Sequence, residues 1–425
     1  MFMFKKISKT AMLQAINTLL PFIIIPYYVR TIGLEGYGQI GVAISILQYL
    51  LLCAEYGFQL PSGRSIAQSK DKKSEASKIF ANTSLVKIAI MFFGILFINI
   101  LNNIIGVSKE LQGLIAIGYL MVIGQLMTPS WIFLGRERVD LYLVFLIIPR
   151  ILIIPAIIFY INQDSDLMLA MLFQVMPNIV TAILTTYWAI KKDWISLVMP
   201  NFKEMKVQAF IAWPFFISSF ATSFYTSSTP IILNSLCGAY SVGVYLIADK
   251  VRQGFLAILT PISLVVYPKV SREFLVSVKD TYLIINKISK LILIGFIFIS
   301  TIGFIFSDYI IIKIFGDNAI NSVSVLQILS MSTIFTSINT ILGTFILVPL
   351  GAEKLLSKVL IFSGFFHLIC TTVLVAIFNY KGAAFGVFFT ELLMVSLMVF
   401  FLMHKDIKMN KCCYKQSVFK GLLSA

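Results

Sequence analysis

The chain has 425 residues, of which 59% are hydrophobic and only 12% are Asp, Glu, Lys or Arg. Soluble globular proteins carry about 25% charged residues, so this share is too small to cover a water-facing surface of this size. The net charge of +15 is the excess of 34 Lys and Arg over 19 Asp and Glu. The basic residues lie mostly in short connections between apolar runs, as in membrane proteins, so the charge does not indicate nucleic acid. We therefore exclude a soluble enzyme, a nucleic-acid-binding protein and a secreted disulfide scaffold, and we predict an all-α polytopic membrane protein.

Apolar runs of about 20 residues, each long enough to cross a hydrocarbon core of roughly 30 Å, recur along the whole chain. Twelve transmembrane helices are predicted. They cover residues 11–31, 36–60, 79–105, 113–134, 139–161, 167–190, 209–236, 243–266, 290–312, 323–349, 355–378 and 382–403. The connections between them are too short to house a catalytic domain.

The ends and connections of the chain predict its orientation. The N-terminal sequence MFMFKKISKT turns apolar without a small-residue cleavage site, so we expect the first span to remain as a helix. Most Lys and Arg fall in one alternating set of connections and at the two ends, which places both termini in the cytoplasm by the positive-inside rule. Cys412 and Cys413 lie in the basic tail and are expected to be reduced and cytoplasmic.

Two short segments resemble each other. Residues 34–42 join spans one and two, and residues 236–244 join spans seven and eight, with Leu, two Gly and Val at matching positions. A chance match explains so short a similarity equally well. If it is a repeat, an even number of spans in each half makes the repeats parallel, as in secondary transporters with a binding site between the halves.

An ordered series of short motifs resembles the Wzx-type polysaccharide flippases of the multidrug, oligosaccharidyl-lipid and polysaccharide (MOP) exporter superfamily. The motifs are Arg30-Thr-Ile-Gly-Leu-Glu-Gly-Tyr-Gly38, Glu55-Tyr-Gly-Phe58, Arg64-Ser-Ile-Ala67, Pro129-Ser-Trp-Ile-Phe-Leu-Gly135, Gly243-Val-Tyr245, Asp249-Lys250, Tyr267-Pro268-Lys-Val-Ser271, Phe315-Gly316, Gly382-Ala-Ala-Phe-Gly386 and Thr390-Glu391. The series covers nearly the whole chain. His367 departs from the family, which more often carries Asn there, and we attach no role to it.

The resemblance implies a fold, a substrate and a location. The fold would be twelve helices in two six-helix lobes, residues 1–208 and residues 209–425 with the basic tail, around a central and often cationic cavity. The substrate would be an undecaprenyl-diphosphate-linked oligosaccharide repeat unit, moved from the cytoplasmic to the periplasmic leaflet of the bacterial inner membrane. Membrane lipids, a polysaccharide polymerase and a chain-length regulator are the expected partners. No catalytic residue, metal or cofactor is expected.

Charged side chains within the predicted spans are candidates for function, because each costs at least ~2.5–3.5 kcal/mol at the bilayer centre unless it faces a cavity or a partner. They are Glu55, Lys87, Arg150, Asp249, Lys250, Arg252 and Glu391. Glu55 and Lys87 lie at similar depth on neighbouring helices, which favours an internal pair or snorkelling. Asp249 and Arg252 lie three residues apart on one helix face, so they can pair with each other or contact substrate.

These two pairings leave Arg150, Lys250 and Glu391 without a partner of opposite charge. Arg150 and Lys250 are our main candidates for binding the substrate diphosphate, because guanidinium supplies paired donors and ammonium a point charge. Arg252 and Arg30 are further substrate-binding candidates, although an interfacial anchor explains Arg30 equally well. Glu391 and Asp249 are candidates for ion coupling.

Two other classes of function compete with the flippase. A drug or organic-cation antiporter of the same superfamily would favour a surplus of acid in the cavity, whereas the spans hold four basic and three acidic side chains. A membrane-embedded polysaccharide-processing enzyme needs a large outer loop or a buried catalytic set, and neither is visible. No G-x-x-x-x-G-K-[ST] motif occurs, so transport must draw on an ion gradient, the membrane potential or consumption of product.

Overall fold

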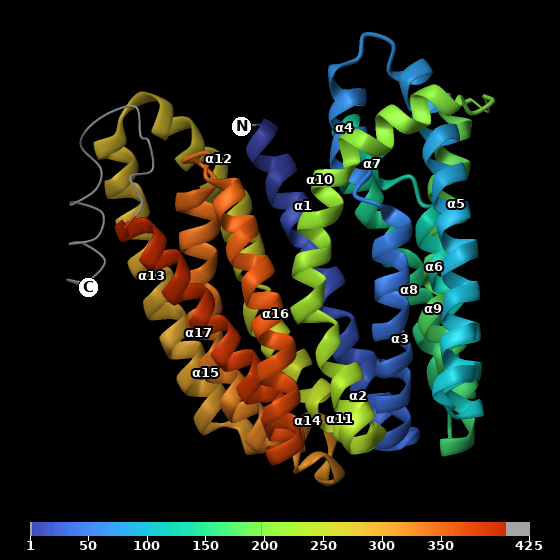
Figure 1. The fold of residues 1–425 in the computed structure, drawn as a ribbon, viewed down its shortest axis with the longest axis vertical. Helices are drawn as coiled ribbons and strands as arrows, with labels where there is room; N and C mark the ends of the chain where they lie inside the picture. Colours follow the sequence, from blue (N-terminus) through green and yellow to red (C-terminus); the bar gives the residue numbers. More distant parts are fainter. Residues whose placement is uncertain (1, 197, 405–425) are drawn as a thin grey trace. The chain divides into compact units, whose positions relative to one another are not determined.

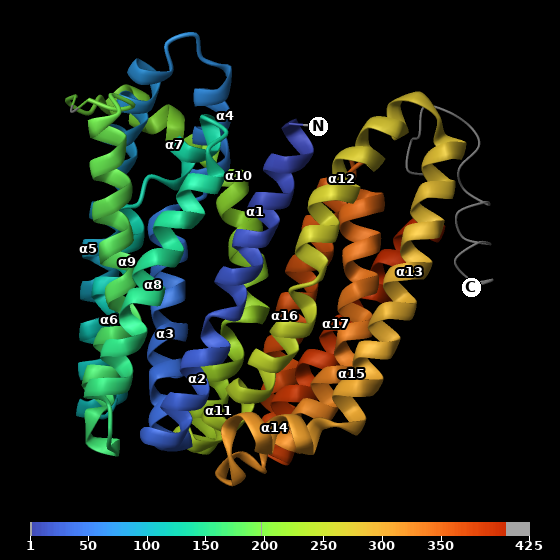
Figure 2. The same ribbon diagram turned by 180° about the vertical axis from the view of Figure 1, so that it is seen from behind.

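The computed structural model describes residues 2–196 and 198–404, and every regular element in these ranges is a helix. The chain forms two compact units, Met1–Gly243 and Val244–Ala425, whose helices are shown in Figures 1 and 2. The basic tail 405–425, with Cys412 and Cys413, lies outside the described residues. The expected boundary between the two six-helix lobes, between residues 208 and 209, stays a prediction.

Besides a 3-10 helical turn (Asp164–Asp166), the described part of unit 1 contains ten α-helices and the first part of an eleventh. They are α1 (Phe2–Leu19), α2 (Pro21–Thr31), α3 (Gly33–Glu55), α4 (Gln59–Gln68), α5 (Lys72–Ile105), α6 (Lys109–Met127), α7 (Ser130–Gly135), α8 (Val139–Tyr160), α9 (Leu167–Lys191), α10 (Phe202–Thr226) and the start of α11 (Ser228–Leu256). In this unit α3 packs on α6, α6 on α9, α9 on α8 and α8 on α1. Helix α10 packs on α3, α4 and α5.

Unit 2 holds the rest of α11 and a bundle of long helices. The further elements are α12 (Leu259–Val276), α13 (Val278–Ile305), α14 (Ser307–Phe315), α15 (Ser322–Thr340), a π-helical turn (Ile341–Leu347), α16 (Glu353–Phe378) and α17 (Tyr380–His404). Helix α17 lies between α15 and α16. Gly382 allows α16 and α17 to meet closely, because a Cβ there would lie 2.0 Å from the Leu374 carbonyl oxygen.

Polar caps begin the helices that follow the basic connections. The Asp71 carboxylate accepts hydrogen bonds from the backbone N–H of Lys73 and of Ser74, at 3.1 and 3.0 Å, and so begins α5. The Asn201 side-chain oxygen accepts from the backbone N–H of Lys203 at 3.0 Å and begins α10. Each cap contributes about 1 kcal/mol and fixes where the helix starts.

The two similar segments of the sequence meet inside unit 1. A Cβ on Gly38 would lie 1.9 Å from the Ala239 carbonyl oxygen, and a Cβ on Gly243 would lie 2.0 Å from the Leu34 carbonyl oxygen. Backbone therefore rests directly on backbone at both points, and only glycine permits this approach.

Eleven helical segments within the described ranges are long and apolar enough to cross a membrane. The all-α membrane fold is thus confirmed, whereas the count of twelve spans stays a prediction. The expected span 209–236 falls on α10 and the start of α11, where the chain bends at Ser227. Gly238 has φ 79° and ψ 170°, which interrupts α11 where the connection to span eight was expected.

Candidate functional site

Arg150 lies midway along α8 and makes a short contact with α1. Its Nη1 donates a hydrogen bond to the Asn17 Oδ1 at 2.6 Å. Pro149 directly precedes it inside the helix and is buried. No opposite charge was matched to Arg150 from the sequence, and the partner found here is a neutral amide, which satisfies one donor without cancelling the charge.

Glu55 on α3 and Lys87 on α5, for which an internal pair or snorkelling was predicted, lie close enough for their charges to interact. Lys87 is only 5% exposed. Tyr142 on α8 interacts with both Glu55 and Arg150. We call Asn17, Glu55, Lys87, Tyr142 and Arg150 the unit 1 polar cluster. It extends over four helices and carries two positive charges and one negative charge.

Asp249 and Arg252 form the ion pair that their spacing on α11 predicts. The Arg252 Nε and Nη2 lie 2.9 and 2.8 Å from the Asp249 Oδ1, and both side chains are more than four-fifths buried. The Gln253 amide donates to the other Asp249 oxygen at 2.6 Å. Asp249 thus has both oxygens occupied, and Arg252 is held in one orientation.

Glu391 on α17 is 2% exposed, and it has partners that the sequence did not assign. Asn339 on α15 donates to the Glu391 Oε2 at 2.6 Å and to its backbone oxygen at 3.1 Å. Thr336, one turn earlier on α15, also hydrogen-bonds the carboxylate, and Arg252 interacts with it electrostatically. Arg252 therefore lies in the field of two carboxylates, those of Asp249 and Glu391.

Lys250 follows Asp249 directly on α11. Its Nζ donates to the Gln253 Oε1 at 3.3 Å, and its charge interacts with Asp249. Lys250 therefore lies in the field of the Asp249 carboxylate. We call Asp249, Lys250, Arg252, Gln253 and Glu391, with Thr336 and Asn339 on α15, the unit 2 polar cluster.

His367 on α16 is fully buried beside this cluster. Its Nδ1 lies 2.9 Å from the Thr390 Oγ1 and 3.3 Å from the Thr371 Oγ1, and its ring interacts electrostatically with Arg252. The imidazole links α16 to α17. The sequence marked this residue only as unusual.

The structure thus brings four of the six candidate residues together in unit 2, and it places Arg150 in unit 1. Arg30 is exposed in the last turn of α2. Sequence reasoning missed Asn17, Tyr142, Gln253, Thr336 and Asn339. They are neutral, and an uncharged polar side chain on an apolar helix is too common to single out.

Comparison with known proteins identifies the family. A family model described as "Polysaccharide biosynthesis protein" matches residues 3–274. The chain belongs to this family. Two relatives bear the name "Putative O-antigen transporter": one from Escherichia coli (strain K12) is 30% identical over 92% of this chain and 94% of its own length, and one from Shigella dysenteriae is 26% identical over 93% and 98%.

Solved structures show what fold this polysaccharide biosynthesis protein has. An inward-facing MATE family multidrug resistance transporter of the MOP superfamily has a TM-score of 0.71 and 14% identity, covering 92% of this chain and 97% of its own. The lipid II flippase MurJ has a TM-score of 0.70 and 13% identity, covering 100% and 96%. The family and the fold confirm the Wzx-type resemblance, the multi-pass membrane architecture and a transporter in place of an enzyme.

Proposed function

We propose that this protein is a flippase that moves an undecaprenyl-diphosphate-linked oligosaccharide repeat unit from the cytoplasmic to the periplasmic leaflet by alternating access. The family supports a lipid-linked polysaccharide as substrate. The observation that supports a diphosphate-linked substrate is the position of Arg150. Its guanidinium lies in the middle of a membrane-spanning helix, and its contact with the neutral Asn17 leaves its charge uncancelled. A charge kept there despite its cost in lipid is a functional feature by default.

Arg150 and Lys250 bind the diphosphate in this proposal. Guanidinium offers fixed paired donors that match phosphate oxygens, and ammonium can turn its three donors to fit. Within the described residues, the side-chain hydrogen bonds of Arg150 and Lys250 go to neutral amides, those of Asn17 and Gln253. An anion can therefore approach either cation without first breaking a short ion pair. Arg30 remains a further candidate at the helix end.

Arg252 differs from these two because it is already bound by Asp249. As a substrate ligand it would have to leave that carboxylate. We propose instead that Asp249, Arg252 and Glu391 form the ion-coupling group. Neutralisation of Glu391 by a proton or a cation would remove one of the two charges that attract Arg252. The energy available is about 2.3 kcal/mol per charge per 100 mV of membrane potential, enough to bias two conformations.

The drug or organic-cation antiporter is less well supported. The fold similarity to multidrug transporters is compatible with it, but the described carboxylates of the unit 2 polar cluster are already occupied by Arg252, Asn339 and Gln253. A cationic drug would have to displace these contacts.

Complementation tests the function. A bacterial strain that lacks its own repeat-unit flippase should recover surface polysaccharide when this chain is expressed, with an empty vector as control. The same strain should show no change in resistance to cationic drugs. Recovery of drug resistance without polysaccharide would favour the antiporter and contradict the flippase. A polymerase and a chain-length regulator are expected to act on the product at the periplasmic face.

A further inference from the structure

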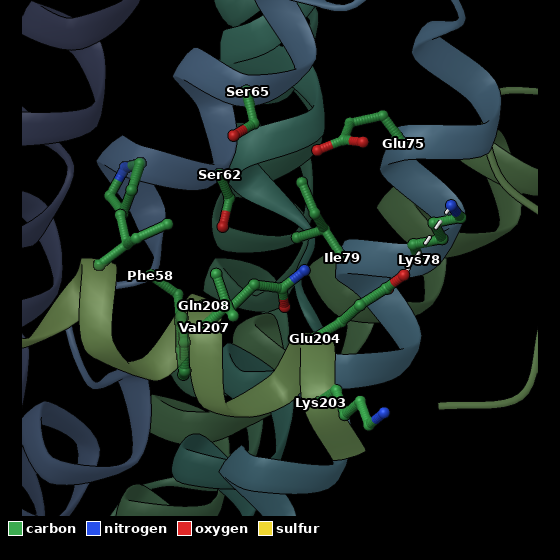
Figure 3. Close-up of a pocket in the computed structure, with 12 residues that line it drawn as sticks. Phe58, Ser62, Ser65, Glu75, Lys78, Ile79, Lys203, Glu204, Val207 and Gln208 are labelled. Atoms are coloured by element: carbon green, nitrogen blue, oxygen red, sulfur yellow. Dashed lines mark ion pairs between the residues drawn. The ribbon is translucent and has the colours of Figure 1, made fainter. Parts of the chain in front are cut away.

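A pocket of about 340 Å³ lies in unit 1 where α4, α5 and α10 meet, far along the chain from Arg150 (Figure 3). Its volume falls in the range of small-molecule sites, about 300–1,000 Å³. The wall from α4 carries Ser62 and Ser65, the wall from α5 carries Glu75 and Lys78, and α10 supplies the third wall. Neither proposed substrate residue takes part in it.

The charges around this pocket sum to zero. Lys78 and Lys203 are opposed by Glu75 and Glu204. The Lys78 Nζ lies 3.9 Å from the Glu204 Oε1, the pair drawn dashed in Figure 3. Among the described residues neither Lys203 nor Glu75 forms an ion pair, so one ammonium and one carboxylate remain for a ligand.

The Glu204 side chain of α10 is held in place by a buried amide, that of Asn82. Asn82 is 1% exposed, and its Nδ2 donates to the Glu204 Oε2 at 3.1 Å. The Asn82 Oδ1 in turn accepts from the Asn201 backbone N–H at 2.7 Å, next to the start of α10. Glu204 is therefore positioned before any ligand arrives.

Neutral polar groups and apolar groups complete the pocket. Ser62 is buried, and the buried Gln208 Oε1 accepts no hydrogen bond from the described residues. Phe58 and Ile79 supply apolar surface. A ligand that fits must therefore combine an anion, a cation and a hydrophobic part.

Exposed apolar side chains of α10 flank the pocket. On α10, next to the pocket, Val207 is 58% exposed and Phe210 81% exposed. An acyl chain can lie along this apolar surface while its headgroup occupies the pocket.

We propose that this pocket binds the phosphoethanolamine headgroup of a membrane phospholipid. Lys203 contacts the phosphate at one end of the pocket, and Glu75, with the Ser hydroxyls of α4 beside it at the other end, accepts hydrogen bonds from the primary ammonium. A choline headgroup has no N–H to donate to Glu75. An anionic headgroup would leave the carboxylate of Glu75 without a cation. The bound lipid ties α10 to α4 and α5.

Native mass spectrometry and thermal unfolding of the purified full chain test this site. Dioleoyl phosphatidylethanolamine should bind and raise the midpoint of unfolding more than the phosphatidylcholine or phosphatidylglycerol with the same acyl chains. Lys203→Gln and Glu75→Gln should each weaken its binding about tenfold. Lys206→Gln, which removes the same charge from an exposed position of α10 outside the pocket, should leave binding unchanged.

Three outcomes would overturn the proposal. Equal binding of the three lipids would show no headgroup recognition, and unchanged binding in both pocket variants would place the lipid elsewhere. Equal protection by soluble phosphoethanolamine would show that the free compound, not the lipid, is the ligand. These readouts do not involve transport, so they stand or fall separately from the flippase proposal.

Discussion

Arg150 offers the sharpest test at the scale of single residues. Arg150→Ala should weaken binding of the lipid-linked diphosphate by one to two orders of magnitude, because a charge-assisted hydrogen bond contributes about 1.5–3 kcal/mol. Arg150→Lys should also be impaired, since the charge remains but the paired geometry is lost. Binding to purified protein measures both effects, and Lys381→Ala at an exposed position is the matched control.

Thermal unfolding separates this role from a structural one. If Arg150 is retained for a ligand, Arg150→Ala should unfold no earlier than the wild type, since a buried charge is removed. An early-unfolding variant with normal substrate affinity would assign Arg150 to the architecture of α1 and α8.

Glu391 tests ion coupling. Glu391→Gln keeps a side-chain oxygen that can accept from Asn339 but removes the charge that faces Arg252. We expect flipping to lose its dependence on pH or on sodium, while Glu353→Gln, at an exposed acid, retains it. A Glu391→Gln protein whose pH and sodium dependence match the wild type would remove Glu391 from the mechanism.

The sequence predicted the charged members of both polar clusters but not how they are satisfied. Asp249 and Arg252 lie on one helix, so their spacing alone predicts the pair. Asn17 and Asn339 lie 133 and 52 residues from their charged partners, so their contacts depend on tertiary packing. Counting charges therefore left Arg150 and Glu391 without partners that they have.

At the scale of elements, the glycine contacts between the two similar segments set how closely α3 and α11 approach. Gly243→Ala would place a Cβ 2.0 Å from the Leu34 oxygen, and neither backbone can yield cheaply. We expect a loss of about 1–3 kcal/mol in stability, the usual cost of overpacking. Gly295→Ala is the control, because its Cβ would meet no atom within 4 Å.

The thermal midpoint in detergent gives the comparison. Gly243→Ala should unfold earlier than the wild type, whereas Gly295→Ala should unfold at the same temperature or later, since alanine favours a helix. Equal midpoints for the two variants would show that the close approach at Gly243 is not required. Most spans predicted from hydropathy coincide with long apolar helices of the structure. Hydropathy could not predict the bend at Ser227, because the apolar sequence continues from α10 into the start of α11.

At the scale of the whole molecule, the distribution of Lys and Arg predicts the orientation in the membrane. A reporter fused after Ala425 should report the cytoplasm, and one inserted at Asp164, in the exposed turn before α9, should report the periplasm. A periplasmic C-terminus would contradict the even number of spans. This experiment also decides whether α10 and the start of α11 cross the membrane as the seventh span.

Flipping by the purified protein tests the central claim most directly. The full chain is reconstituted in proteoliposomes that carry an undecaprenyl-diphosphate-linked oligosaccharide in the outer leaflet, and the fraction that becomes protected from an external glycosidase is followed over time. Our account predicts protection faster than in protein-free vesicles and a rate at least about tenfold lower for the Arg150→Ala and Lys250→Ala proteins. Protection no faster than in protein-free vesicles, or equal rates in all three proteins, would contradict it.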